Sequence, residues 1–325
     1  MSKFVQKINR NSLAWIIFIM FILNVVLSTL LDNLFIILLF VLKEWSYTMQ
    51  YLWIYYGYNI VNILLLLLIC LKIKKNRFIL RAFLPLGKGK KHDTEVIEDT
   101  FVPSQNNTLK TLLLGMLMGV LTLSISVACA LIHKDIKLSF AFNASQIPLF
   151  LIAFLMVAVQ SSSEELWCRG FMYERINVHY PLWVSIVTNG VFFSLLHILL
   201  NSEINIIALL NLCICGISYS LIRWYSGSIW LVIGIHTMWN FAQSFIFGLP
   251  NSGTVADISL FHLDSTLNTA GNLIYDPSFG VEDALPALIV DAVICIVILL
   301  LAKKNGRLKE LFMSYEQKAS AEFSE

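Results

Sequence analysis

An apolar run that ends in charge lies at residues 148–169, which read PLFLIAFLMVAVQSSSEELWCR. The run is about 20 residues long, which is the length that an α-helix needs to cross the hydrocarbon core of a bilayer. Glu164, Glu165 and Arg169 lie at its end. A charged side chain inside a membrane helix costs on the order of 3 kcal/mol on insertion scales, so such residues are functional by default. The stretch therefore predicts a membrane helix that carries part of a site.

The composition of the whole chain agrees with this interpretation. Of the 325 residues, 58% are hydrophobic and 14% are charged, whereas soluble domains have roughly 25% charged residues. These values indicate a polytopic integral membrane protein whose surroundings are membrane lipid. The net charge is +2 and the basic residues form no stripe, so we expect no nucleic-acid partner.

Apolar runs of spanning length predict an all-α polytopic membrane protein with about eight transmembrane helices. The first run has no cleavage site after it and is too long for a signal peptide, so we interpret it as an uncleaved span that kinks or splits. The predicted spans are 12–42, 51–71, 111–133, 148–169 with a continuation toward 176, 181–200, 204–222, 228–247 and 285–302.

Lysine and arginine in the connections orient these spans. They gather in the N-terminal segment, in the second loop, after the fourth and sixth spans and in the tail, whereas the long loop 248–284 has none. The positive-inside rule therefore places both termini in the cytoplasm, and an even number of spans agrees. Because no targeting signal is apparent, we expect a bacterial cell membrane.

The same pattern divides the chain into four parts. Residues 1–71 are expected to hold N-terminal transmembrane helices, and 72–110 a cytoplasmic linker with a basic front and an acidic back. Residues 111–302 form the predicted catalytic bundle, with all motifs within 164–240, and 303–325 form a cytoplasmic tail.

The charged residues at the end of the fourth span divide into a pair and a single carboxylate. Glu165 and Arg169 are four residues apart and so pair on one helix face. Glu164 points about 100° away, where the nearby sequence offers no cation. A desolvated carboxylate without a partner is suited to accept a proton from water. The alternative is that both glutamates are ordinary flanking residues at the aqueous edge.

Two later spans carry polar residues of the same kind. His197 lies in the apolar stretch Phe193-Ser-Leu-Leu-His197, where a packed core histidine is the competing interpretation. His236 and Asn240 are four residues apart on one face of the seventh span. They are suited either to holding an oxyanion or to a structural hydrogen bond between helices.

Three motifs occur in a fixed order: Glu164-Glu165-x-x-x-Arg169, Phe193-x-x-x-His197 and His236-x-x-x-Asn240. Over about residues 145–250 the sequence resembles the CAAX protease and bacteriocin-processing (Abi) family of intramembrane endopeptidases, which includes the prenyl-protein CAAX endopeptidase. The resemblance implies hydrolysis of a peptide bond in a membrane-associated protein or peptide. A prenylated C-terminus, a leader peptide and a transmembrane segment all remain open as substrates.

The resemblance also implies a role for each motif residue. Glu164 would activate water with the help of His197, and His236 and Asn240 would bind the developing oxyanion. Glu165 and Arg169 would orient the site. A zinc ion held by Glu164, His197 and His236 remains an alternative. We prefer metal-free glutamate and histidine chemistry, because the sequence lacks the His-Glu-x-x-His helix typical of zinc proteases.

Two other functions and one geometric difficulty stay open. A non-catalytic bacteriocin self-immunity or scaffold protein of the same fold is the leading alternative. A proton-coupled transporter is less favoured, because no internal repeat is apparent.

If the fifth span starts at 181, His197 lies roughly 24 Å along it and closer to the outer side than Glu164 and His236. That separation requires 171–179 to lie along the surface, or a strong stagger of the helices.

Overall fold

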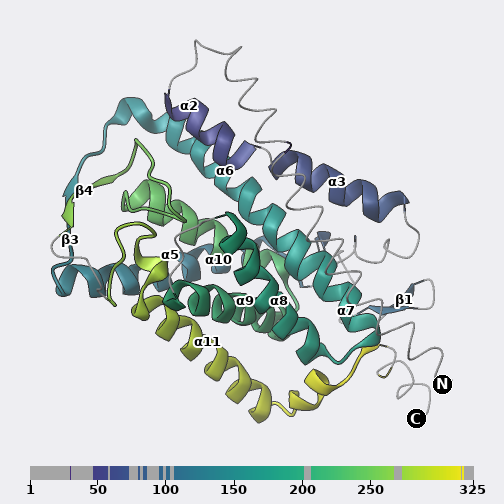
Figure 1. The fold of residues 1–325 in the computed structure, drawn as a ribbon. Coiled ribbons are helices and arrows are strands. Elements are labelled where there is room, and N and C mark those ends of the chain that lie inside the picture. The colour runs from purple at the N-terminus through teal and green to yellow at the C-terminus, as the bar shows by residue number, and fades with distance from the viewer. Residues whose placement is uncertain are drawn as a thin grey trace.

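Long apolar runs fold into helices throughout the part of the chain that the computed structural model describes (Figure 1). The described residues are 30, 47–57, 59–72, 80, 83–85, 95–97, 100–102, 106–200, 206–266, 273–315 and 317. Nearly all of the predicted first span, 12–42, lies outside them. The predicted all-α class is confirmed, since strands in this part form just two short antiparallel ladders.

The elements follow the chain in a simple order. The α-helices are α2 (Tyr47–Leu52), α3 (Asn59–Lys72), α5 (Leu109–Ile132), α6 (Ile147–Glu165), α7 (Tyr173–His179), α8 (Leu182–Leu200), α9 (Ile206–Ser226), α10 (Ile229–Phe241) and α11 (Leu285–Lys304). The π-helical turns are η1 (Trp53–Gly57), η4 (Leu166–Met172) and η5 (Ala242–Ile246), and the 3-10 turns are η3 (Ala144–Gln146), η6 (Val281–Asp283) and η7 (Leu308–Phe312). Strand β1 (Glu95–Ile97) pairs with β2 (Thr100–Val102), and β3 (Ile136–Phe140) pairs with β4 (Phe261–Thr266).

Four helices are long and apolar enough to cross a membrane, which indicates an integral membrane protein. They are Leu109–Ile132, Ala144–His179, Ile206–Ser226 and Leu285–Lys304, which correspond to the third, fourth, sixth and eighth predicted spans. The predicted spans 51–71, 181–200 and 228–247 are also largely helical, but as shorter helices. The total of eight spans therefore stays a prediction.

Glycines allow α5 and α10 to pack in close contact. A Cβ atom on Gly115 would lie 2.0 Å from the carbonyl oxygen of Leu231, and one on Gly119 would lie 2.3 Å from that of Ile235. Residue numbers rise in the same direction along these contacts, so the two helices are parallel. Parallel helices are expected here, because the third and seventh predicted spans cross the membrane in the same direction. Small residues at membrane helix interfaces permit this backbone approach, which van der Waals packing then stabilises.

The start of α10 is fixed by the start of α5. The Asn107 side-chain oxygen accepts hydrogen bonds from the backbone N–H groups of Ile229 and Trp230, at 3.0 and 3.3 Å. Ser228 caps α10 and also contacts Thr111 in the capping box of α5. Because unpaired N–H groups at a helix start need acceptors, these contacts align the two helix ends.

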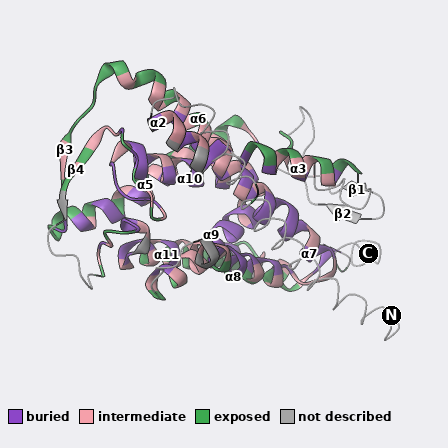
Figure 2. Cartoon of the chain, turned by 45° about the horizontal axis from the view of Figure 1, so that its top comes forward, coloured by how far each residue is buried: buried purple, intermediate pink, exposed green. Residues whose placement is uncertain are grey.

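Apolar side chains face outward on the peripheral helices. Figure 2 shows exposed residues along α3 and buried residues along α7. On α5 and α11 the exposed large apolar residues include Leu117, Leu121, Val293 and Leu300. An apolar exterior around a partly polar interior is the arrangement expected of helices whose outer surface contacts lipid.

Candidate active site

The charged motif lies inside one continuous helical segment rather than at its end. Residues 144–179 run as η3, α6, η4 and α7, and the π-helical turn η4 begins directly after Glu165. Single π turns within α-helices occur frequently at functional sites. Here Arg169 donates from Nη1 to Oε1 of Glu165 at 2.9 Å, and both side chains are fully buried. The predicted pair is thus formed.

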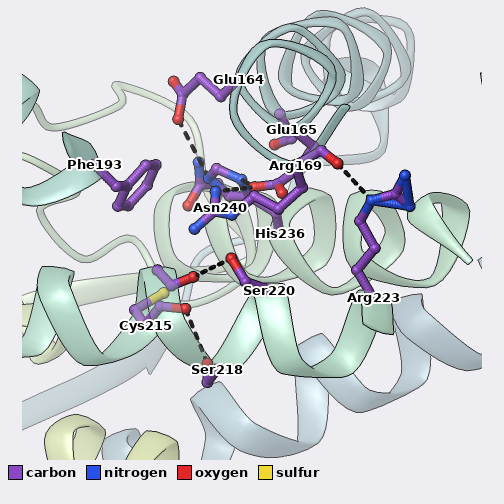
Figure 3. Close-up of polar contacts among 12 residues, drawn as sticks. Glu164, Glu165, Arg169, Phe193, Cys215, Ser218, Ser220, Arg223, His236 and Asn240 are labelled. Atoms are coloured by element: carbon purple, nitrogen blue, oxygen red, sulfur yellow. Dashed lines mark hydrogen bonds and ion pairs between the residues drawn. The ribbon is translucent and has the colours of Figure 1, made fainter. Parts of the chain in front are cut away.

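His236 lies between the two glutamates (Figure 3). Its Nδ1 is 2.9 Å from Oε1 of Glu165, and its Nε2 is 3.8 Å from Oε2 of Glu164. The side chain of Glu165 is fully buried, whereas that of Glu164 is 27% exposed. Glu165 is therefore placed to orient the imidazole, whereas the side chain of Glu164 is partly exposed, with its Oε2 buried on the side of His236.

His197 approaches the same point from α8. Its Nδ1 donates to the carbonyl oxygen of Phe193 at 2.8 Å, which in the neutral ring leaves Nε2 as an acceptor. The Phe193 ring lies 4.6 Å from the ring of His197 and 6.2 Å from that of His236, measured between centroids. Glu164 and His236 both interact electrostatically with His197. The three motifs thus converge.

The helix bounds remove the difficulty over the depth of His197 relative to Glu164 that the sequence left open. The helix that carries Glu164 continues to His179, and after a short turn α8 starts at Leu182 and packs against α7. The number of residues from Glu164 to the helix end at His179 equals the number from the helix start at Leu182 to His197. The two side chains are therefore equally far from the turn, and neither a surface segment at 171–179 nor a stagger is needed.

Gln160 joins the carboxylate of Glu164 to the amide of Asn240, and it was not among the predicted site residues. One helical turn before Glu164, its Nε2 donates to Oε1 of Glu164, and its Oε1 accepts from Nδ2 of Asn240 at 3.2 Å. The second carboxylate oxygen of Glu164 has no hydrogen-bond partner among the described residues. The signal in the sequence was the i, i+4 spacing of Gln160 and Glu164.

Arg169 is enclosed by aromatic rings. Its guanidinium carbon lies 4.6 Å from the ring centroid of Phe193 and 5.3 Å from that of Tyr219. Ring faces attract a cation, and more strongly where water is excluded. The close approach of α8 to α9 leaves little room here, because a Cβ atom on Gly216 would lie 2.7 Å from Cα of Gly190. Because the Phe193 ring contacts both the Arg169 guanidinium and the ring of His197, it lies between His197 and the ion pair of Glu165 and Arg169.

The loop after α10 covers this end of the helix and brings in another carboxylate that was not predicted. The Asn251 side chain donates to the carbonyl oxygen of Asn240 at 3.4 Å. The hydroxyl of Ser252 donates to Glu282 at 3.0 Å, and its backbone N–H does so as well. Burial raises the pKa of Glu282 to about 7, and the negative charge of Glu164 acts in the same direction, while hydrogen bonds from Ser252 and the charge of His236 oppose it.

The donor groups do not assemble into a metal site. Within the described ranges, no three His, Cys, Asp or Glu side chains are placed to hold a metal ion together. Both nitrogens of His236 face carboxylates, and Nδ1 of His197 is bonded to a backbone carbonyl. Such Nδ1 bonds are also made by metal-bound histidines, so the observation against zinc is that Glu164, His197 and His236 are not grouped to hold one ion together within the described residues. The proposed mechanism contains no step through a metal.

The site thus holds a partly exposed carboxylate beside two histidines and a carboxamide, on helices with an apolar exterior. Residues 143–242 match the family model described as type II CAAX prenyl endopeptidase Rce1-like. The match includes every predicted site residue and supports the resemblance to the CAAX protease family. The family is a protease family. No curated protein matches the chain.

Proposed function

We propose that this protein is an intramembrane endopeptidase that hydrolyses a peptide bond in a membrane-associated protein or peptide. The observation that carries the proposal is the convergence of Glu164, His197 and His236 from three different helices. Isolated polar residues in membrane helices have structural explanations, but three that meet beside a partly exposed carboxylate are suited to activating water.

In the proposed reaction Glu164 accepts a proton from a water molecule that Nε2 of His197 also binds. The resulting hydroxide attacks the carbonyl carbon of the scissile bond. The oxygen becomes negative and is held by Nδ2 of Asn240 and by Nε2 of an imidazolium at His236, whose Nδ1–H remains bonded to Glu165. The C–N bond then breaks, and the proton on Glu164 passes to the leaving amine. Preorganised donors of this kind contribute about 3 kcal/mol each.

Glu165, Arg169 and Gln160 serve this reaction by position. Glu165 fixes the ring of His236, and Arg169 neutralises the buried charge of Glu165. Gln160 sets the distance between the base and the amide. The proposal also includes eight spans and cytoplasmic termini, which hydropathy and charge distribution support. It includes a catalytic bundle at 111–302, supported by the position of the motifs within 164–240, and a bacterial membrane, supported by the lack of an apparent targeting signal.

The test compares peptides in membrane fractions from cells that express the native chain, the Glu164→Gln variant or the Asp264→Asn variant. Asp264 is a suitable control because it lies on β4 and bonds Ser139 at an exposed position. We expect new N- and C-termini with the native and Asp264→Asn proteins and none with Glu164→Gln. The identity of the cleaved ends would also assign the substrate class.

Equal sets of termini in all three samples, at equal protein abundance, would contradict the protease proposal. A phenotype retained by Glu164→Gln under those conditions would favour the non-catalytic alternative, a bacteriocin self-immunity or scaffold role.

A further inference from the structure

The segment that follows the last helix returns to the helix that carries the charged motif. Figure 1 shows this segment, in yellow, running from the end of α11 toward the end of α7. The backbone N–H of Leu182, at the start of α8, donates to the carbonyl oxygen of Met313 at 3.3 Å. Leu311 and Tyr315 are both buried. The tail is therefore packed into the bundle up to Tyr315.

Arg307 anchors the start of this returning segment. Its Nη1 donates to the carbonyl oxygen of Tyr225 at 2.9 Å, and its Nη2 to that of Trp224 at 3.4 Å. These are carbonyls of the last turn of α9, where a helix has acceptors without partners of its own. Asn305 adds a hydrogen bond to the Tyr225 hydroxyl at 2.8 Å. The tail is thus held against the α9 end independently of Tyr315.

Tyr315 reaches a second buried ion pair, distinct from the pair of Glu165 and Arg169. Its hydroxyl donates to Oε2 of Glu174 at 2.5 Å, and Nη2 of Arg223 is paired with Oε1 of the same carboxylate. All three side chains are at most 3% exposed. A buried carboxylate is stable only when its oxygens are satisfied, so the tyrosine completes the environment of Glu174.

Arg223 connects this pair to the motif. Its Nε donates to the backbone carbonyl oxygen of Arg169, inside the π-helical turn η4 (Figure 3). The side chain of Arg169 binds Glu165, and Glu165 binds His236. The Tyr315 ring also packs in the same apolar cluster as Trp167, Met172 and Phe193. A continuous series of contacts therefore leads from the tail to the imidazole of the site.

We propose that Tyr315 is a positioning residue, which acts through Glu174 and Arg223 to hold the η4 turn and, with it, Glu165 and His236 in their working geometry. The inference rests on the proposed protease function for its kinetic consequence but not for its structural one. Without the tyrosine hydroxyl, one oxygen of Glu174 loses its donor, and Arg223 is drawn away from the Arg169 carbonyl toward the unsatisfied carboxylate.

The test uses the full-length protein in lipid nanodiscs and the substitution Tyr315→Phe, which keeps the ring in its cluster and removes the hydroxyl. Tyr225→Phe is the matched control, because it also removes a tyrosine hydroxyl from the tail interface but touches neither Glu174 nor Arg223. Hydrogen–deuterium exchange of peptides covering 166–176 gives a readout that needs no cleavage. We expect several-fold faster exchange there in Tyr315→Phe and native exchange in Tyr225→Phe.

With a substrate identified by terminus mapping, we expect kcat to fall roughly tenfold in Tyr315→Phe at unchanged KM, as lost hydrogen bonding to a charged group predicts. In an Arg223→Lys background, which lacks the Nε donor, the same substitution should cause little further loss. Unchanged exchange at 166–176 in Tyr315→Phe, equal changes in both phenylalanine variants, or additive losses with Arg223→Lys would each overturn the proposal. If the native protein cleaves nothing, the protease proposal fails while the exchange experiment still decides this one.

Discussion

Adjacent side chains at this site differ in burial and are therefore suited to different roles. Glu164 and Glu165 are adjacent in sequence, yet Glu165 is fully buried and bound to Arg169 and His236, while Glu164 remains accessible. Two carboxylates placed in different environments can take different roles, one structural and one chemical. The helical rotation of about 100° between neighbours is what separates them.

The first prediction concerns the buried pair. Glu165→Gln leaves Arg169 charged and without its counter-ion in an apolar interior, and breaking a buried pair in this way destabilises by about 3–5 kcal/mol. We expect a clear fall in the thermal unfolding temperature of the protein in nanodiscs. The control is Glu310→Gln, whose pair with Arg307 is about one-third exposed and contributes about 0–1 kcal/mol. Equal stability of both variants would contradict the role of Glu165.

The second prediction concerns Gln160, which binds both Glu164 and Asn240. Gln160→Ala removes both hydrogen bonds, so we expect kcat/KM to fall roughly tenfold or more, since hydrogen bonds to charged groups contribute about 1.5–3 kcal/mol. Steady-state cleavage rates measure the effect. Gln146→Ala, at the start of the same helix and without a cap hydrogen bond, should retain native kinetics. Native activity in Gln160→Ala would mean that Glu164 and Asn240 are positioned without it.

Much of the site at this scale could be predicted from the sequence. The pair of Glu165 and Arg169 follows from helical spacing, and the convergence of the three motifs follows from the family resemblance. For Gln160 the sequence offered only its i, i+4 spacing to Glu164, because its second partner, Asn240, lies 80 positions away. Tyr315 carried no signal, because its partner Glu174 lies 141 positions away.

At the scale of elements, the loop after α10 carries a carboxylate with a raised pKa. Glu282 lies in η6, outside the membrane-spanning helices, and burial raises its pKa from 4.5 to about 7. The folded protein therefore binds more protons at this residue than the unfolded chain between about pH 4.5 and 7. Stability contributed by this group is fully present below pH 4.5 and is lost as the pH rises through 7.

The third prediction follows from the raised pKa of Glu282 in the folded protein. Glu282→Gln stays neutral at every pH, so its unfolding temperature should decline less than that of the native protein between pH 5 and pH 8. Differential scanning fluorimetry in nanodiscs at a series of pH values measures both. An identical decline in the two proteins would show that Glu282 does not have a raised pKa in the folded state.

The helix that carries the motif extends slightly beyond its predicted continuation toward 176. The apolar run ends near Ser161, but the helix continues through η4 and α7 to His179 because the later residues bury their charges against α9 and the tail. Hydropathy reports contact with lipid, and it does not report polar residues that are satisfied inside a bundle. For that reason the sequence left the depth of His197 relative to Glu164 open.

At the scale of the whole molecule, the apolar exterior and the polar interior were both predictable. The composition indicated a membrane protein, and the helical class is confirmed. The number of spans stays a prediction, because α8 and α10 are not among the four helices long and apolar enough to cross a membrane, and nearly all of the first predicted span lies outside the described residues. The position of the tail against α7 was not predictable, since no pattern in residues 303–325 indicates a buried segment.

The fourth prediction concerns metal dependence. Because the described residues bring no three ligands together, we expect purified protein dialysed against 1,10-phenanthroline to retain its cleavage rate. Elemental analysis of the dialysed sample is the necessary control for metal content. Activity that disappears on chelation and returns with added zinc, but does not return in His197→Ala, would show that the site closes around a metal.

The fifth prediction tests the central claim, that Glu164 activates the attacking water. The measurement is the rate of cleavage of a substrate identified by terminus mapping, with purified native and Glu164→Gln proteins in nanodiscs. A general base contributes typically 10²–10⁴-fold, so we predict a loss of kcat in that range while KM stays within about twofold. A Glu164→Gln enzyme that keeps kcat within tenfold of native would contradict the claim and assign the base to another group.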